Sequence, residues 1–246
     1  MSPTSSRLNI DNIDCLTNPS IEDRLECSNV LYDAFSKDRY TNQLYGQNVE
    51  LRRLSHDIDI RATLVDCEVW VARVKDESVA GGTVIASVAC VSPPGKDIFD
   101  SHPDKEAMFD DLIECTTDST AQWYTNHVIP CLGGESTAGF KTETFYIEGF
   151  GTRPEYQGRG LGTALLSRLK DHARESGGRL GLATDDERTA RLYEKAGFKD
   201  IHNAELSYED GGETVRLRTM CNDCGLESWR AASCEANNDE DGAHQG

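Results

Sequence analysis

Three glycines spaced by single residues, Gly158, Gly160 and Gly162, stand where a β-rich segment gives way to an apolar helical pattern. Glycine has no Cβ, so the backbone amides of such a turn can approach a ligand closely. The helix that follows would add its unpaired N–H groups and the positive end of its dipole. The turn therefore predicts a binding site for an anion, and phosphate suits it best.

Two well-known phosphate-binding motifs do not fit this turn. A Walker A loop needs a lysine before its Ser or Thr, whereas here Thr163 follows Gly162 directly. A dinucleotide-binding fingerprint needs a third glycine at the position that Thr163 occupies. For a glycine cluster taken by itself, a turn that only connects a strand to a helix stays open as an alternative.

A second motif begins at Asp186 and reads DERTARLYEKAGF. Together with the QGRGLG turn it resembles the GNAT superfamily of acetyl-CoA-dependent N-acetyltransferases. The turn matches the family pattern Gln/Arg-x-x-Gly-x-Gly/Ala at every defined position. The later motif matches at Leu192, Tyr193, Gly197 and Phe198 and departs at Asp186 and Thr189, where Asn and Ala are usual. The resemblance is firm over residues 146–201 and weaker back to residue 20 and on to residue 220.

This resemblance implies an α/β (α+β) fold with a mixed, mostly antiparallel central sheet flanked by helices. One strand would splay from its neighbour, and Phe150, Gly151 and Thr152 on it would hold the pantetheine arm and polarise the thioester carbonyl as oxyanion-type donors. The pyrophosphate of acetyl-CoA, the co-substrate, would bind at Gln157, Gly158, Arg159, Gly160, Leu161, Gly162 and Thr163. Asp186 is equally well a cofactor contact or a helix N-cap. No metal is implied.

Two residues are candidates for proton transfer. The resemblance makes Tyr193 the general acid that protonates the leaving thiolate, because a phenol with a pKa near 10 is close to a thiol near 8.5. The alternative is an aromatic side chain packed in the core. Glu148, two residues before Phe150 and expected on the same strand face, is the candidate general base. Its alternative is a solvated strand acid.

Composition limits the class of protein. The 25 Lys and Arg against 43 Asp and Glu give a net charge of −18, which argues against nucleic acid or an anionic membrane as a partner and favours a cationic amine. Apolar runs stay far below the roughly 18 residues of a membrane span, and the N-terminus lacks a signal-peptide core. Nine scattered cysteines, including the isolated pair Cys221 and Cys224, fit reduced thiols in a cytoplasmic protein without a metal site.

Periodicity and turn residues predict the elements that position these motifs. Helices are expected over residues 21–34, with Ser20 and Asp23 at its start, and over 160–176, 186–196 and about 121–128. Strands are expected over residues 67–74, 82–91, 144–152, 179–184, 205–208 and 214–220, the last two joined by a turn at 210–212. Residues 36–62 are expected to form a loop or short helices.

The domain plan has three parts. Residues 1–19 are expected to be an extension, residues 20–221 the acetyltransferase domain with an insertion at 92–143, and residues 222–246 an acidic disordered tail. The favoured hypothesis is a monomeric or homodimeric N-acetyltransferase that moves acetyl from acetyl-CoA to a primary amine of a small molecule or peptide by direct attack. The alternative is a non-catalytic acyl-CoA-binding regulatory or scaffold protein of the same fold.

Overall fold

The computed structural model describes residues 10–77, 79, 82–132, 137, 139–207 and 214–229. Its centre is a sheet of seven strands in the order β1-β2-β3-β4-β5-β7-β6. The β4–β5 pair is parallel and the other described pairs are antiparallel, which confirms the predicted fold class. The strands are β1 (Ile10–Cys15), β2 (Glu68–Lys75), β3 (Thr83–Ser92), β4 (Phe145–Thr152), β5 (Leu180–Thr184), β6 (Lys199–Leu206) and β7 (Val215–Asn222).

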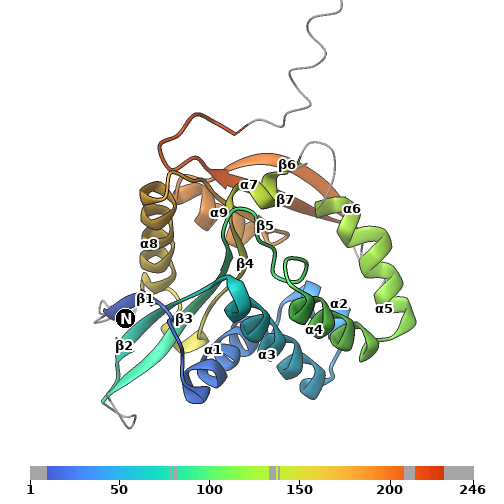
Figure 1. The fold of residues 1–246 in the computed structure, drawn as a ribbon, viewed down its shortest axis with the longest axis horizontal. Helices are drawn as coiled ribbons and strands as arrows, with labels where there is room; N and C mark the ends of the chain where they lie inside the picture. Colours follow the sequence, from blue (N-terminus) through green and yellow to red (C-terminus); the bar gives the residue numbers. More distant parts are fainter. Residues whose placement is uncertain are drawn as a thin grey trace, which may run out of the picture.

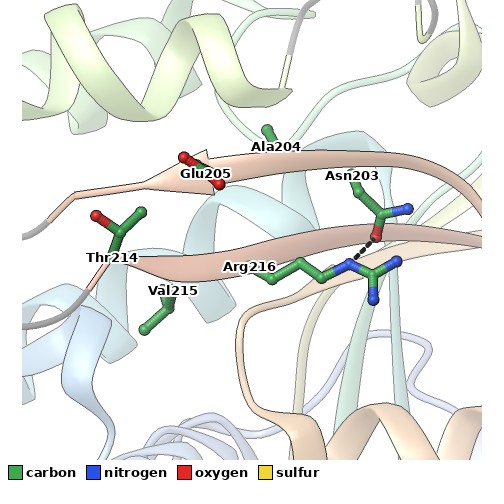
Figure 2. A pocket seen from close by; sticks show the side chains of 6 residues that line it. All are labelled: Asn203, Ala204, Glu205, Thr214, Val215 and Arg216. Carbon is green, nitrogen blue, oxygen red and sulfur yellow. Dashed lines mark hydrogen bonds between the residues drawn. The ribbon is translucent and has the colours of Figure 1, made fainter.

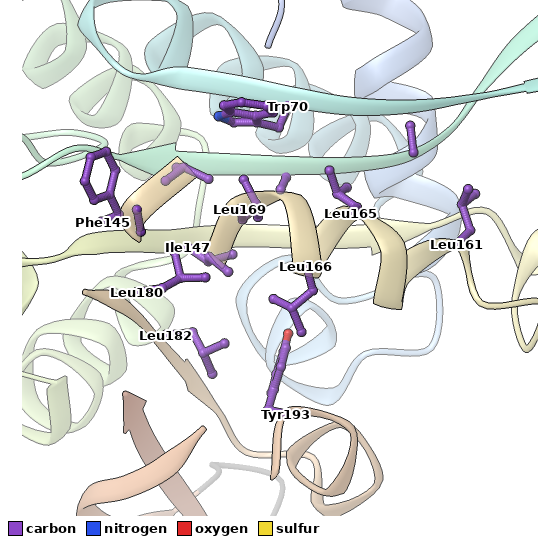
Figure 3. Close-up of a cluster of buried hydrophobic side chains, with 14 of the residues drawn as sticks. Trp70, Phe145, Ile147, Leu161, Leu165, Leu166, Leu169, Leu180, Leu182 and Tyr193 are labelled. Atoms are coloured by element: carbon purple, nitrogen blue, oxygen red, sulfur yellow. The ribbon is translucent and has the colours of Figure 1, made fainter. Parts of the chain in front are cut away.

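Helices cover both faces of the sheet, because successive side chains of a strand point to opposite sides (Figure 1). Helix α8 (Leu161–Glu175) packs on one face through its leucines, as Figure 3 shows. Helices α1 (Ile21–Ala34) and α3 (Val49–Asp66) belong to the other face. The core on the α8 face contains Trp70, Ala86, Val91, Phe145, Ile147, Leu165 and Leu169. The core on the α1 and α3 face contains Val30, Leu31, Ile60, Val69, Val71, Ile85, Val88 and Cys90.

The region before β2 shows one correct and one wrong prediction. Helix α1 spans the predicted residues, and Ser20 and Asp23 form a capping box at its start. Residues 36–62, expected to be a loop or short helices, instead hold α2 (Arg39–Tyr45) and most of the 18-residue helix α3. Helix α3 buries polar residues beside its apolar ones, among them Arg52, Ser55 and His56, so its buried face is not visible as an apolar pattern.

The segment between β3 and β4 is helical and runs from α3 toward the hairpin of β6 and β7 (Figure 1). It contains α4 (Pro103–Glu114), α5 (Asp118–Trp123), a π-helical turn (Tyr124–Val128), α6 (Ile129–Leu132) and α7 (Phe140–Glu143). The indole Nε1 of Trp123 donates a hydrogen bond of 2.7 Å to the carbonyl of Ser207, beyond β6. At the other end, the fully buried Lys105 forms an ion pair with Asp66 of α3.

Contacts at both ends of the described chain bear on the predicted domain limits. Strand β1, within the expected extension, pairs with β2 and so belongs to the sheet. Asn222 is the last residue of β7, and the ring of Trp229 packs edge-on against Phe140 at 4.9 Å, so the chain stays attached well past residue 222. Short or solvated pieces of this kind gain their order from tertiary contacts that composition does not reveal. The remaining tail, and the hairpin turn predicted at 210–212, lie outside the described residues.

In the described part of the chain, no helix is both long and apolar enough to cross a membrane.

Candidate active site

Strands β4 and β5 separate part of the way along β4. They pair at Phe145–Leu180, Tyr146–Gly181 and Ile147–Leu182, and β5 then continues beside β7 as far as Thr184. The second half of β4 stays paired with β3. Its other edge therefore presents backbone groups without a strand partner, which is the expected splay.

A β-bulge decides which groups face this opening. The pairing of β4 with β3 shifts by one residue between Ile147 and Gly149, so Glu148 is the extra residue. Beyond it, the Gly151 carbonyl accepts a hydrogen bond from Ser87 of β3. By alternation, the backbone groups of Phe150 and Thr152 point to the open side.

The bulge also corrects the predicted orientation of Glu148. The ring of Phe150 packs with the core on the α8 face, whereas the carboxylate of Glu148 meets Ser92 and Lys141. A Cβ added to Gly151 would lie 2.9 Å from the Cβ of Ala34 in α1, so this glycine serves helix packing. Glu148 and Phe150 thus lie on opposite faces, because the extra residue reverses the alternation expected for an unbroken strand.

The glycine-rich turn has the geometry that its residues predict. Gly158 and Gly160 have φ values of +71° and +86°, and a Cβ on either would meet no atom within 4 Å. Gly160 is the N-cap of α8 and provides no side-chain cap. The first helical N–H bond described is from Ala164 to Gly160, so the N–H groups of residues 161–163 remain available for an anion.

The other predicted turn residues have distinct roles in this structure. The Leu161 side chain is buried in the core, so only its backbone can serve a ligand. A Cβ on Gly162 would lie 3.4 Å from Thr152 Oγ1 and 3.5 Å from the Phe150 ring, which ties the start of α8 to the splay. The side-chain amide of Gln157 donates to the Thr152 carbonyl at 2.9 Å.

Asp186, from the second motif, accepts a hydrogen bond of 2.6 Å from the N–H of Thr189. It is therefore the N-cap of α9 (Glu187–Lys195).

A cationic hollow beside the turn was not predicted. It has a volume of about 370 Å³ and lies between α8 and α9, lined by Thr163, Arg188, Arg191, Leu192, Lys195 and Ala196. Within the described residues, Arg188, Arg191 and Lys195 have no hydrogen-bond or ion-pair partner, and Arg159 of the turn has none either. The spacing of the three α9 cations, by three and four residues, is the pattern that could have revealed this shared helix face.

Helix α9 separates its charges between two faces. Its acids Glu187 and Glu194 both turn toward Arg218 of β7, which is also paired with Asp200 of β6. The Arg218 side chain is 8% exposed, so these carboxylates are committed to a structural ion pair. The neighbouring face of the helix presents the cations of the hollow, and this arrangement suits a ligand with several negative charges.

Tyr193 is a residue of α9, and its side chain lies near the splay. Its ring centroid is 6.5 Å from that of Phe150, and Figure 3 shows its hydroxyl directed toward Leu166 of α8. Burial, with a smaller effect of Asp186, raises the pKa of this phenol above its ordinary value. The transfer of a proton from Tyr193 to a free thiolate is therefore more costly than the close match of pKa values expected from the sequence.

Glu148 belongs to a buried charge network instead of facing solvent. Its carboxylate accepts a hydrogen bond of 2.9 Å from Ser92 and lies 3.1 Å from the ammonium of Lys141. Lys141 also pairs with Asp97 and lies 5.4 Å from the centre of the Tyr146 ring. Burial raises the pKa of Glu148, and Lys141 acts against this effect. Lys141 comes from the segment between β3 and β4, for which the sequence suggested no role.

Two other features carry no ligand chemistry here. A hollow of about 350 Å³ on the β6–β7 hairpin, seen in Figure 2, is lined in part by Arg216. This cation is already bound by Asn203 at 2.8 Å and by Asp200 at 3.2 Å.

Among the described residues no group of three His, Cys, Asp or Glu side chains is placed to hold a metal. Burial raises the pKa of both Cys221 and Cys224.

Comparison with solved structures places this fold among acetyltransferases. Over 86% of the chain, a polyamine N-acetyltransferase of Drosophila melanogaster matches at 13% identity and TM-score 0.56, with all of that chain covered. A mosquito arylalkylamine N-acetyltransferase-like protein matches at 15% identity and TM-score 0.55, covering 86% of this chain and 99% of its own. An N-acetyltransferase of Staphylococcus aureus Mu50 matches at 18% identity and TM-score 0.50, covering 86% of this chain and all of its own.

At these identities the likeness concerns the fold alone, and the search of curated protein sequences found no match. A family model gives the more specific result. The model of the acetyltransferase (GNAT) family matches residues 38–198, a range that includes the splay, the glycine turn, α9 and the segment between β3 and β4. More than half of the chain thus follows the pattern of one family, and the protein belongs to the GNAT acetyltransferases.

Proposed function

We propose that this protein is an acetyl-CoA-dependent N-acetyltransferase that moves the acetyl group to a cationic primary amine by direct attack. The observation that carries the proposal is the continuity of three features. The N–H groups at the start of α8 lie beside the α9 cations, which have no partner among the residues that the structure describes. Gly162 joins both to the open backbone edge of β4. A long ligand with phosphates at one end and a polar arm at the other suits this arrangement.

The residues of this chain would divide the work of holding acetyl-CoA. The turn residues 157–163 would bind the pyrophosphate, with Arg159 and the α9 cations Arg188, Arg191 and Lys195 adding charge. The backbone of Phe150 and the N–H of Thr152, whose carbonyl already accepts from Gln157, would hold the pantetheine arm and polarise the thioester carbonyl. Gly151 would contribute by allowing α1 to pack closely, and Asp186 by capping α9.

Charge supports a cationic acceptor on the α1 and α3 face. Burial is the largest effect that raises the pKa of the half-buried Tyr124. The carboxylates of Glu148, Asp97 and Asp59 raise it further, whereas the Lys141 ammonium lowers it. An incoming ammonium would offset the excess negative charge of this set. The Drosophila melanogaster polyamine N-acetyltransferase of similar fold catalyses the formation of N-acetylagmatine.

Tyr193 would protonate the departing sulfur. Because burial opposes an isolated phenolate, its proton would have to be replaced as it leaves, and the second proton of the attacking nitrogen is the available source. The eight cysteines among the described residues are free thiols, which is consistent with the cytoplasmic location that we propose.

Two measurements test this function. Isothermal titration should show that acetyl-CoA binds, and a thiol-release assay over a panel of mono- and diamines should show turnover with an N-acetylated product by mass spectrometry. Binding without turnover of any amine would favour the non-catalytic acyl-CoA-binding alternative. Absence of binding would exclude both.

A further inference from the structure

Helix α3 contains a histidine whose second ring nitrogen has no partner. His56 is 6% exposed, and its Nδ1 lies 3.2 Å from Oδ2 of Asp59. Its Nε2 is buried and has no hydrogen-bond partner among the described residues. A buried polar atom without a partner is costly, and such atoms are rare in folded proteins.

Asp59 determines the chemical state of this nitrogen. When the imidazole is neutral, its Nδ1–H donates to the carboxylate, so the lone pair is on Nε2. A carboxylate at Nδ1 also stabilises the imidazolium that forms when Nε2 takes a proton. His56 and Asp59 therefore have the arrangement of a base held ready for a proton at Nε2.

Contacts place this pair beside the splay. The His56 ring stacks on Phe35 with centroids 5.6 Å apart. Phe35 directly follows Ala34, whose Cβ would be 2.9 Å from a Cβ on Gly151 of β4. Gly151 lies between the two residues whose backbone faces the opening. Phe35 and Ala34 thus connect the histidine to β4 on the α1 and α3 face.

Glu148, the base expected from the sequence, is less suited to this step. One of its oxygens accepts from Ser92 at 2.9 Å, and the other lies 3.1 Å from Lys141. Each oxygen therefore already has one partner before any amine arrives. A base must have a lone pair within reach of the proton that it takes.

We propose that His56, oriented by Asp59, accepts the proton that the acceptor ammonium loses before it attacks, directly or through one water. This inference rests on the proposed function. The neutral nitrogen forms the C–N bond to the acetyl carbon as the C–S bond breaks. Tyr193 protonates the thiolate, the second nitrogen proton replaces that of Tyr193, and the imidazolium returns its proton to solvent.

Three charged groups surround this base and enter its pH dependence. They are Asp59 on its own helix, Asp38 at the start of α2, which His56 influences electrostatically, and Arg52 one turn earlier. The Arg52 guanidinium is bound by the carbonyls of Phe35 and Ser36 at 3.0 and 2.9 Å.

The test is the pH profile of kcat/KM for the best amine found with the parent protein. We expect His56→Gln to lower kcat/KM about 10²-fold or more and to remove the rise of activity with pH, while acetyl-CoA still binds. Asp59→Asn should move this rise to lower pH, because the imidazolium loses its carboxylate. Glu148→Gln should keep the rise.

The matched control is His172→Gln. His172 pairs with Glu68 at 3.0 Å but lies on the α8 face, against Trp70, so its loss should leave the profile unchanged. If His56→Gln does not bind acetyl-CoA, Asp59→Asn decides the question. If the parent protein is active and its pH profile of kcat/KM is unchanged in the His56 and Asp59 variants, this inference is wrong and the proposed function stands. If the parent protein acetylates no amine, the proposed function is wrong as well.

Discussion

The carboxylate of Glu148 and the ammonium of Lys141 lie 3.1 Å apart. They are on the face of the sheet opposite to the one on which the ring of Phe150 packs. Burial acts to lower the pKa of the Lys141 ammonium, but Glu148 and Asp97 raise this pKa above its ordinary value. Lys141 thus stays charged and cannot serve as a nucleophile. Its effect is to oppose the rise in the pKa of Glu148 that burial causes.

Replacement of Lys141 by Met should therefore destabilise the protein in a pH-dependent way. Without this cation the pKa of Glu148, already raised by burial, rises further. The folded state then favours the protonated acid, so stability is retained below the ordinary glutamate pKa and is lost as pH rises. We expect a loss of about 2 kcal/mol at neutral pH and a smaller loss near pH 4.5, by urea denaturation. Lys141→Met/Glu148→Gln should recover most of it, and equal losses at both pH values would contradict this explanation.

Gly160→Ala should weaken cofactor binding by straining the turn. Its φ of +86° is unfavourable for alanine although no atom obstructs the new Cβ, at a cost of about 1 kcal/mol. Gly177 is a matched control, because its φ is +68° and its Cβ position is equally open. Both variants should lower the melting temperature alike, but only Gly160→Ala should raise the Kd for acetyl-CoA. Equal affinities in the two variants would remove this turn from the binding site.

Arg191→Gln should reduce both the affinity for acetyl-CoA and its sensitivity to salt. The guanidinium lines the hollow beside α8 without a partner among the described side chains. One such cation near a phosphate is worth about 1 kcal/mol at an exposed site, or roughly a fivefold change in Kd by titration. Arg174→Gln is the control, because Arg174 is also on an exposed helix surface but pairs with Asp171. A similar change in both variants would indicate an effect of net charge alone.

Tyr193→Phe should lower kcat and leave binding intact. No described residue hydrogen-bonds the Tyr193 hydroxyl, so its removal breaks no contact of the fold. We expect kcat to fall about 10²-fold with an unchanged Kd for acetyl-CoA. Because burial raises the pKa of this phenol, its ionisation should not reduce parent activity below about pH 10. Tyr32→Phe, on α1, controls for the loss of a hydroxyl, and full activity of Tyr193→Phe would exclude the proton transfer.

The sequence was informative where local chemistry defines local structure. Gly160 needs a positive φ, and Leu161, Leu165 and Leu169 define one apolar face, so the turn and helix α8 could be predicted. The bulge at Glu148 could not, because it depends on the register between two strands far apart in the chain. The partnership of Lys141 with Glu148 depends on the path of a long segment. The spacing of the α9 cations is visible in the sequence, but the pairing of the acids of that helix with Arg218 is not.

The extra residue in β4 has a consequence for how two reactants would meet. By the proposed function, a ligand held by α8 and α9 would approach from one side of the sheet, and an amine attracted by Asp97 and Glu148 would approach from the other. The sheet keeps the two routes apart except where β4 and β5 diverge. Either reactant could then enter or leave without displacing the other, which predicts a ternary complex with no required order of addition.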